Sequence, residues 1–133
     1  MPKRILVIES DDELREFIGS ALEQDGYEVT TVDDSVRGYN NALFLKPDLI
    51  VTDTRPSDAD ATYIVRRVRD STSIENTPIL VTTAFGSGTA TYSLQLGATS
   101  FEPKPIDLKS FLATVRRLLW ERDSRRIAQL NLF

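Results

Sequence analysis

Five short apolar runs alternate with amphipathic stretches along this chain, and this alternation constrains the fold more than any other feature. The runs are rich in β-branched residues and are uninterrupted, which is typical of strands buried on both faces. They cover residues 4–9, 27–32, 49–53, 79–83 and 99–102. The stretches that follow them have helical spacing or helix caps, and they cover residues 12–24, 35–45, 60–70, 86–96 and 107–119. Repeated strand–helix units predict an α/β fold, in which helices cover both faces of a doubly wound five-stranded parallel sheet.

The residue types that are missing from the chain restrict its chemistry. The 133 residues include no Cys and no His. Disulfides, thiolate or imidazole metal sites and Ser-His-Asp catalysis are therefore excluded. Any chemistry must use carboxylates, lysine, hydroxyl groups or the backbone.

Charge and hydropathy favour a cytoplasmic protein that does not contact membranes. No apolar run approaches the ~20 residues of a membrane span, and Met1 to Arg4 lead directly into the first apolar run rather than into a signal peptide. The net charge of −4 is uneven, because residues 107–133 carry +3 and residues 1–106 therefore carry −7. Nucleic-acid binding is not expected of so acidic a domain.

Polar side chains that could bind a ligand or take part in a reaction lie at the ends of four of the five predicted strands. They are Glu9-Ser10-Asp11-Asp12 after the first strand, Asp53 at the end of the third, Thr82-Thr83 at the end of the fourth, and Lys104 after the fifth. In an open parallel sheet, ligands bind at the carboxyl ends of the strands. Each group alone is better explained as a helix cap, a strand residue or a solvated side chain. Together they favour a Mg²⁺ site and a carboxylate nucleophile toward phosphorus.

Four segments of the chain resemble the receiver domain of two-component response regulators. They are I-L-V-I-E-S-D-D-E-L-R (5–15), P-D-L-I-V-T-D (47–53), T-P-I-L-V-T-T-A (77–84) and G-A-T-S-F-E-P-K-P (97–105). Each segment alone is modest evidence for this family, but the four together at these spacings are highly specific for it. The resemblance implies a flavodoxin-like sheet with strand order 2-1-3-4-5. It also implies a receiver domain over residues 1–122 and a C-terminal helical extension or tail over residues 123–133.

The resemblance implies roles for particular residues. Asp53 would accept a phosphoryl group from a phosphohistidine of a histidine kinase or a histidine phosphotransfer protein. Thr83 and Lys104 would bind the phosphoryl oxygens, Phe101 would be the aromatic switch, and the Lys104-Pro105 peptide bond would be cis. The signal would pass to a downstream target through the fourth helix, fifth strand and fifth helix, and a homodimer is a further expected assembly. Such a domain is not a conventional enzyme, although it can slowly lose its phosphoryl group to water.

The same resemblance implies a Mg²⁺ site made by Glu9, Asp53 and the backbone carbonyl of Arg55. Ser10 stands where the family usually has a metal-binding carboxylate. Since Mg²⁺ gives up its water reluctantly and requires negative charge, we expect weak binding, which Asp11 could partly offset.

The predicted rim of this site also departs from the family. The Arg55 side chain could take the place of the metal as an internal cation, or it could be a solvated rim residue. Ala84 and Phe85 lie on the same rim, and the ring of Phe85 is expected to hinder water and to slow dephosphorylation. Ser57 and Ala61 replace the usual Pro and Gly of the loop after the acceptor, so the loop backbone is expected to differ.

Two functions fit these residues. The set Asp53, Thr83 and Lys104 favours a phosphoacceptor receiver, whereas Ser10 and Arg55 favour a degenerate receiver that acts as a phosphorylation-independent interaction module. A nucleotide- or flavin-binding enzyme is disfavoured, because acidic residues rather than a Gly-rich phosphate loop follow the first strand.

The C-terminal residues carry a second apolar stripe. Trp120, Ile127 and Leu130 lie among several arginines. The favoured interpretation is a frayed tail with Trp120 packed on the domain. The alternative is that the last helix continues and presents this stripe to a partner, such as a second copy of the chain.

Overall fold

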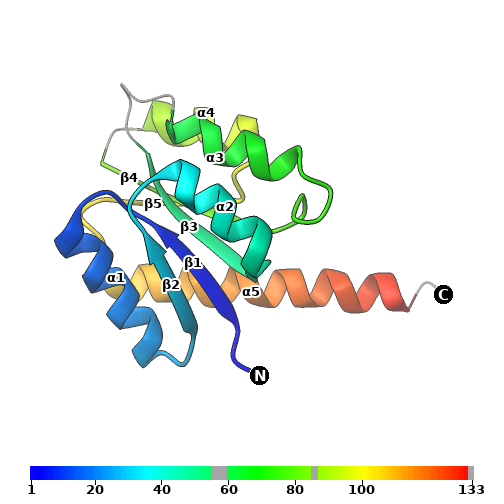
Figure 1. The fold of residues 1–133 in the computed structure, drawn as a ribbon. Helices are drawn as coiled ribbons and strands as arrows, with labels where there is room; N and C mark the ends of the chain where they lie inside the picture. The colour runs from blue at the N-terminus through cyan, green and yellow to red at the C-terminus, as the bar shows by residue number, and fades with distance from the viewer. Residues whose placement is uncertain (55–59, 85–86, 132–133) are drawn as a thin grey trace.

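The computed structural model describes residues 1–54, 60–84 and 87–131, and they form a parallel sheet with helices on both faces (Figure 1). The strands are β1 (Arg4–Ile8), β2 (Glu28–Val32), β3 (Leu49–Thr54), β4 (Ile79–Thr83) and β5 (Ser100–Pro103). Their order across the sheet is β2-β1-β3-β4-β5, and every neighbouring pair is parallel. The predicted fold class and strand order are therefore confirmed.

Five helices follow the strands in alternation. They are α1 (Asp12–Gln24), α2 (Ser35–Leu45), α3 (Asp60–Arg69), α4 (Ser87–Leu96) and α5 (Leu108–Leu130). Asp11, Asp34 and Asp107 cap three of them, because each carboxylate accepts a hydrogen bond from the backbone N–H three residues later. Among the described residues, no helix is both long and apolar enough to cross a membrane.

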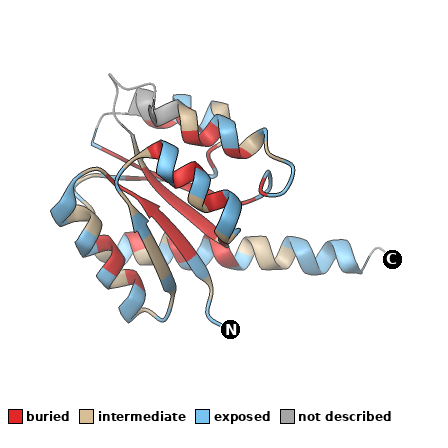
Figure 2. Ribbon diagram, viewed as in Figure 1, coloured by how far each residue is buried: buried red, intermediate tan, exposed pale blue. Residues whose placement is uncertain are grey.

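Alternate residues of the central strands supply two separate hydrophobic clusters, one on each face of the sheet (Figure 2). Leu6, Ile8 and Ile50 pack with side chains of α2 and α3. Ile5, Val7, Leu49 and Val51 pack with side chains of α1 and α5. Because side chains point to opposite faces along a strand, an uninterrupted apolar run is the pattern that such a sheet requires.

The last helix differs from the favoured expectation of a frayed tail. It continues without interruption to Leu130, about 35 Å in all, and the side chain of Trp120 is 68% exposed rather than packed on the domain. Two long-range ion pairs hold the first turn of this extension. Lys3 Nζ lies 2.8 Å from Asp123, and Arg122 pairs with Asp48. These pairs attach the extension to the amino edge of the sheet, and no local sequence pattern encodes them.

Gly38, which weakens the predicted helix propensity of α2, has a packing role. A Cβ atom at this position would lie 2.3 Å from Cδ1 and 2.7 Å from Cγ1 of Ile8, whose side chain is almost fully buried. The absence of a side chain therefore allows α2 to approach β1 closely.

Replacing Gly38 by Ala is expected to destabilise the fold, although Ala favours helices by about 1 kcal/mol over Gly. Core overpacking costs about 1–3 kcal/mol, so the free energy of unfolding in urea should fall by about 1 kcal/mol. Asn40→Ala, at an exposed position of the same helix, is the control and should raise stability slightly. Equal gains for both variants would contradict this packing argument.

Candidate functional site

Asp53 lies at the carboxyl end of β3, in the middle of the sheet. Its backbone pairs with Thr82 of β4, and Thr54 pairs with Thr83 in the next register position. Glu9 follows β1 directly, and its amide donates to Val32 at 3.0 Å. Lys104 follows β5, and its amide donates to the carbonyl of Thr83 at 2.7 Å. The parallel register therefore brings these predicted residues to one edge of the sheet, as the positions of the strand ends predicted.

Ser10 is a direct hydrogen-bond partner of Asp53. Its Oγ donates to Oδ2 of Asp53 at 3.0 Å, and its backbone amide approaches the same oxygen at 3.4 Å. In the sequence alone, Ser10 is only the loss of a metal-binding carboxylate. Its hydroxyl instead supplies a hydrogen-bond donor to Asp53, which an ionised carboxylate could not supply.

Glu9 and Lys104 form a buried ion pair. Lys104 Nζ lies 2.9 Å from Oε1 of Glu9, and the two side chains are 18% and 2% exposed. The backbone amide of Asp11 donates to Oε2 of Glu9 at 3.1 Å. Burial raises the pKa of Glu9 and the nearby Asp53 adds to the rise, while Lys104 and the Asp11 amide oppose it. Lys104 therefore neutralises the charge of Glu9 at the carboxyl edge of the sheet.

Two carboxylates at this edge, Glu9 and Asp53, could hold Mg²⁺. In the part of the chain that the structure describes, no three Asp, Glu, His or Cys side chains are grouped so that they could hold a metal ion. Glu9 and Asp53 remain as a pair, and Oδ1 of Asp11 is engaged as the cap of α1, where it accepts from the Leu14 amide at 2.9 Å. Two carboxylates can still hold Mg²⁺ when phosphate oxygens complete its coordination.

The remaining predicted residues lie at this edge, within β5 or outside the described residues. Thr83 is 3% exposed at the end of β4, and Ala84 after it is exposed. Phe101 on β5 is 41% exposed, and the Lys104-Pro105 peptide bond is cis as expected. The predictions for Arg55, Phe85 and Ser57 fall on residues outside those that the structure describes, as does the side chain of Ala61.

The pH dependence of stability should report the burial of Glu9. Because the folded chain raises the pKa of Glu9 above its ordinary value of 4.5, folding favours the protonated carboxyl. This contribution is complete below pH 4.5 and is lost as the pH rises through the raised pKa. Gln resembles the protonated form and does not titrate. The stability of Glu9→Gln relative to the unmodified chain, measured by urea unfolding, should therefore increase from acidic to neutral pH.

The control for that measurement is Glu16→Gln, which removes a carboxylate from the exposed side of α1. The stability of Glu9→Gln relative to the unmodified chain could instead stay constant with pH or fall as pH rises. Either result would show that burial does not raise the pKa of Glu9.

Comparison with known proteins agrees with this geometry. The family model described as response regulator receiver domain matches residues 5–116. The chain is 34% identical over 120 residues to the response regulator MprA of Mycobacterium sp. (strain KMS), covering 90% of this chain and 51% of that protein. It is 32% identical over 121 residues to the DNA-binding dual master transcriptional regulator RpaA of Synechocystis sp., covering 90% of this chain and 50% of that one. The chain thus spans about half the length of these curated relatives.

Solved structures give the same result. The chemotaxis response regulator CheY4 of Vibrio cholerae superposes with a TM-score of 0.81 at 25% identity, covering 89% of this chain and 99% of that one. A response regulator protein from Burkholderia multivorans superposes with a TM-score of 0.72 at 30% identity, covering 89% and 95%.

Proposed function

The chain belongs to the response regulator receiver domain family of two-component signalling, and from this premise we propose that it is a phosphoacceptor receiver whose acceptor is Asp53. The observation that carries the proposal is the position of Asp53, which lies one residue before the end of the central strand, at the edge that also holds Thr83 and Lys104. A carboxylate with a cation and a hydroxyl beside it can form an acyl phosphate.

The hydrogen bonds of Asp53 indicate which oxygen reacts. Both the hydroxyl and the backbone amide of Ser10 approach Oδ2 of Asp53. We assign the attack on phosphorus to Oδ1. The bond between phosphorus and the partner's histidine nitrogen breaks as the Oδ1–P bond forms, and the imidazole leaves with the electron pair.

Lys104 and Thr83 are then the residues that would stabilise the new phosphoryl group. The Lys104 ammonium can exchange its carboxylate partner Glu9 for a phosphoryl oxygen. Receiver domains bind Mg²⁺ at an acidic pocket, and here Glu9 and Asp53 would hold the ion, which when bound neutralises phosphoryl oxygens. Weak Mg²⁺ binding follows from the presence of Ser10 and from the charge that Lys104 already cancels on Glu9.

A second candidate function is a degenerate receiver that binds its partners without phosphorylation. The specific observation in its favour is that both carboxylates of the acidic edge already have a partner: Ser10 donates to Asp53, and Lys104 forms an ion pair with Glu9. A pocket whose carboxylates already have partners has less need of metal or phosphate to be stable.

Partners follow from the family. Response regulators act with histidine kinases, and we propose such a kinase or a histidine phosphotransfer protein as the donor for this chain. The output surface would lie on α4, β5 and α5, where Tyr92, Leu94 and Phe101 are each more than a third exposed. Its partner would be a downstream target or a second copy of the chain. The relatives named as regulators are about twice as long as this chain. We therefore propose no role in transcription for it.

The experiment that tests the proposal is intact-mass spectrometry of the chain after incubation with a small acyl phosphate, with and without Mg²⁺. Phosphoacceptor activity predicts a gain of one phosphoryl group that depends on Mg²⁺. No gain under any condition would favour the degenerate receiver.

A further inference from the structure

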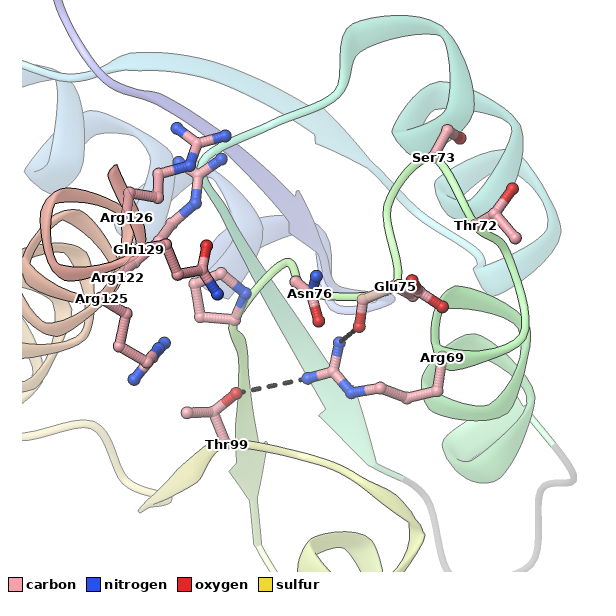
Figure 3. Close-up of a pocket in the computed structure, with 11 residues that line it drawn as sticks. Arg69, Thr72, Ser73, Glu75, Asn76, Thr99, Arg122, Arg125, Arg126 and Gln129 are labelled. Carbon is pink, nitrogen blue, oxygen red and sulfur yellow. Dashed lines mark hydrogen bonds between the residues drawn. The ribbon is translucent and has the colours of Figure 1, made fainter. Parts of the chain in front are cut away.

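A basic cavity lies at the edge of the sheet opposite to Asp53 (Figure 3). It has a volume of about 600 Å³, and its walls come from three segments that are far apart in the sequence. These are residues 69–78 around the end of α3 and the start of β4, Thr99 before β5, and residues 122–129 of the α5 extension. Pro78 and Thr99 immediately precede their strands, so the cavity is at the amino edge of the sheet.

The first wall carries a fixed guanidinium. Arg69 donates to the backbone carbonyls of Gly97 at 2.8 Å, Glu75 at 2.9 Å and Thr77 at 2.7 Å. Its remaining nitrogen, Nη2, has only a long contact of 3.4 Å with the hydroxyl of Thr99. The backbone therefore orients Arg69, but no described carboxylate neutralises its charge.

The opposite wall carries three more arginines on α5. Arg122 is neutralised by Asp48. Arg125 and Arg126 are exposed, and neither forms an ion pair with any carboxylate in the part of the chain that the structure describes. Two other exposed arginines of the same helix do have carboxylate partners: Arg116 pairs with Asp25 at 3.0 Å and Arg117 with Glu121 at 3.5 Å.

The cavity therefore gathers three guanidinium groups without a carboxylate partner, from Arg69, Arg125 and Arg126, against the one carboxylate of Glu75 among its lining residues. Like charges held around a concave surface raise its positive potential, and an anion between them relieves the repulsion. Figure 3 shows Arg125 extending from α5 toward Thr99, while Arg69 reaches Thr99 from the other side. An anion between these walls would contact both.

We propose that this cavity binds a small anion that carries two or more phosphate groups. Guanidinium groups on opposite walls suit an anion with charge at both ends. Arg125 and Arg126 can each make paired hydrogen bonds to a phosphate, and Arg69 can donate from Nη2, because backbone carbonyls occupy its other nitrogens. Hydroxyl and amide groups of Thr72, Ser73 and Gln129 supply further donors, and none of the described residues that line the cavity is aromatic. Recognition thus rests on charge and hydrogen bonds rather than on stacking of a base, and the volume is in the usual range for small-molecule sites.

The test is isothermal titration calorimetry of the full chain with inorganic pyrophosphate, without Mg²⁺ so that the acidic edge cannot contribute through a metal. The chain should bind pyrophosphate, and Arg125→Gln/Arg126→Gln should weaken binding by about tenfold or more, because charge-assisted hydrogen bonds are lost. Arg37→Gln/Arg117→Gln removes the same charge from exposed arginines outside the cavity and should retain most of the affinity. Asp53→Asn should bind as the unmodified chain does, so the result is independent of phosphorylation.

Three results would overturn the proposal. The first is the absence of pyrophosphate binding by the unmodified, folded chain. The second is an equal loss of affinity in the two double variants, which would indicate attraction by overall charge alone. The third is binding of a single-stranded oligonucleotide that depends on Arg125 and Arg126 when pyrophosphate does not bind, which would assign the surface to nucleic acid.

Discussion

Asp53→Asn is expected to abolish the gain of a phosphoryl group completely. The amide of Asn is not a nucleophile toward phosphorus at neutral pH, whereas its carbonyl oxygen can still accept the hydrogen bond that Ser10 gives to Oδ2 of Asp53. The fold should therefore persist while the chemistry is lost. Intact-mass spectrometry after treatment with a small acyl phosphate and Mg²⁺ measures this, and circular dichroism verifies that the variant is folded.

The matched control is Asp33→Asn, which removes a carboxylate from the surface before α2, where Asp33 lies 3.2 Å from Arg37. It should gain a phosphoryl group as the unmodified chain does. If Asp53→Asn gained the group to the same extent, another oxygen would be the acceptor and the assignment would be wrong. If the unmodified chain gained no phosphoryl group, the degenerate receiver would be the better description of its function.

Ser10→Asp should raise the affinity for Mg²⁺ by about tenfold or more, because a third carboxylate joins Glu9 and Asp53 and metal affinity depends on ligand charge. Without metal the same change should lower stability. The hydrogen bond from Ser10 Oγ to Asp53 at 3.0 Å is lost, and two carboxylates then face each other. Added Mg²⁺ should restore the lost stability, so the melting temperature of the variant should depend strongly on Mg²⁺ concentration. Thermal unfolding with and without Mg²⁺ and calorimetric titration measure both effects.

Ser10→Asn is the control, because Asn has the size of Asp without its charge. It should show little gain in Mg²⁺ affinity and little rescue of stability by the metal. Equal behaviour of the Asn and Asp variants, or an Asp variant with unchanged affinity, would show that charge at residue 10 does not limit the site. Phosphorylation of Ser10→Asp should then be no more efficient than that of the unmodified chain.

Much of the fold could be predicted from local sequence because local rules and the global fold agree. The run from Arg4 to Ile8 is typical of a strand buried on both faces. Asp11, Asp34 and Asp107 stand at helix starts, where their carboxylates cap the helices. The predicted strand limits were off by one residue in places. For example, β5 begins at Ser100 rather than at residue 99, because hydrogen bonds between strands set these limits and composition does not.

The candidate site was also predictable only in part. Which residues meet at the carboxyl edge followed from the strand ends, since parallel strands place those ends together. Which side chains pair with one another at that edge could not be predicted from the strand ends. Lys104 pairs with Glu9, and β3 and β4 lie between their strands. Ser10 reaches Asp53 across 43 residues of sequence, so these contacts depend on the sheet order and on side-chain conformation.

By itself, the sequence determined the alternation of strands and helices, the caps, and the set of groups at the carboxyl edge, because these depend on residue type and spacing over a few residues. Only the tertiary structure decided the length and direction of α5, the exposure of Trp120, and the basic cavity that α5 makes with Arg69. The physical reason is that a short amphipathic helix is marginal alone, and the contacts that hold the extension, from Arg122 to Asp48 and from Asp123 to Lys3, join residues 74 and 120 positions apart.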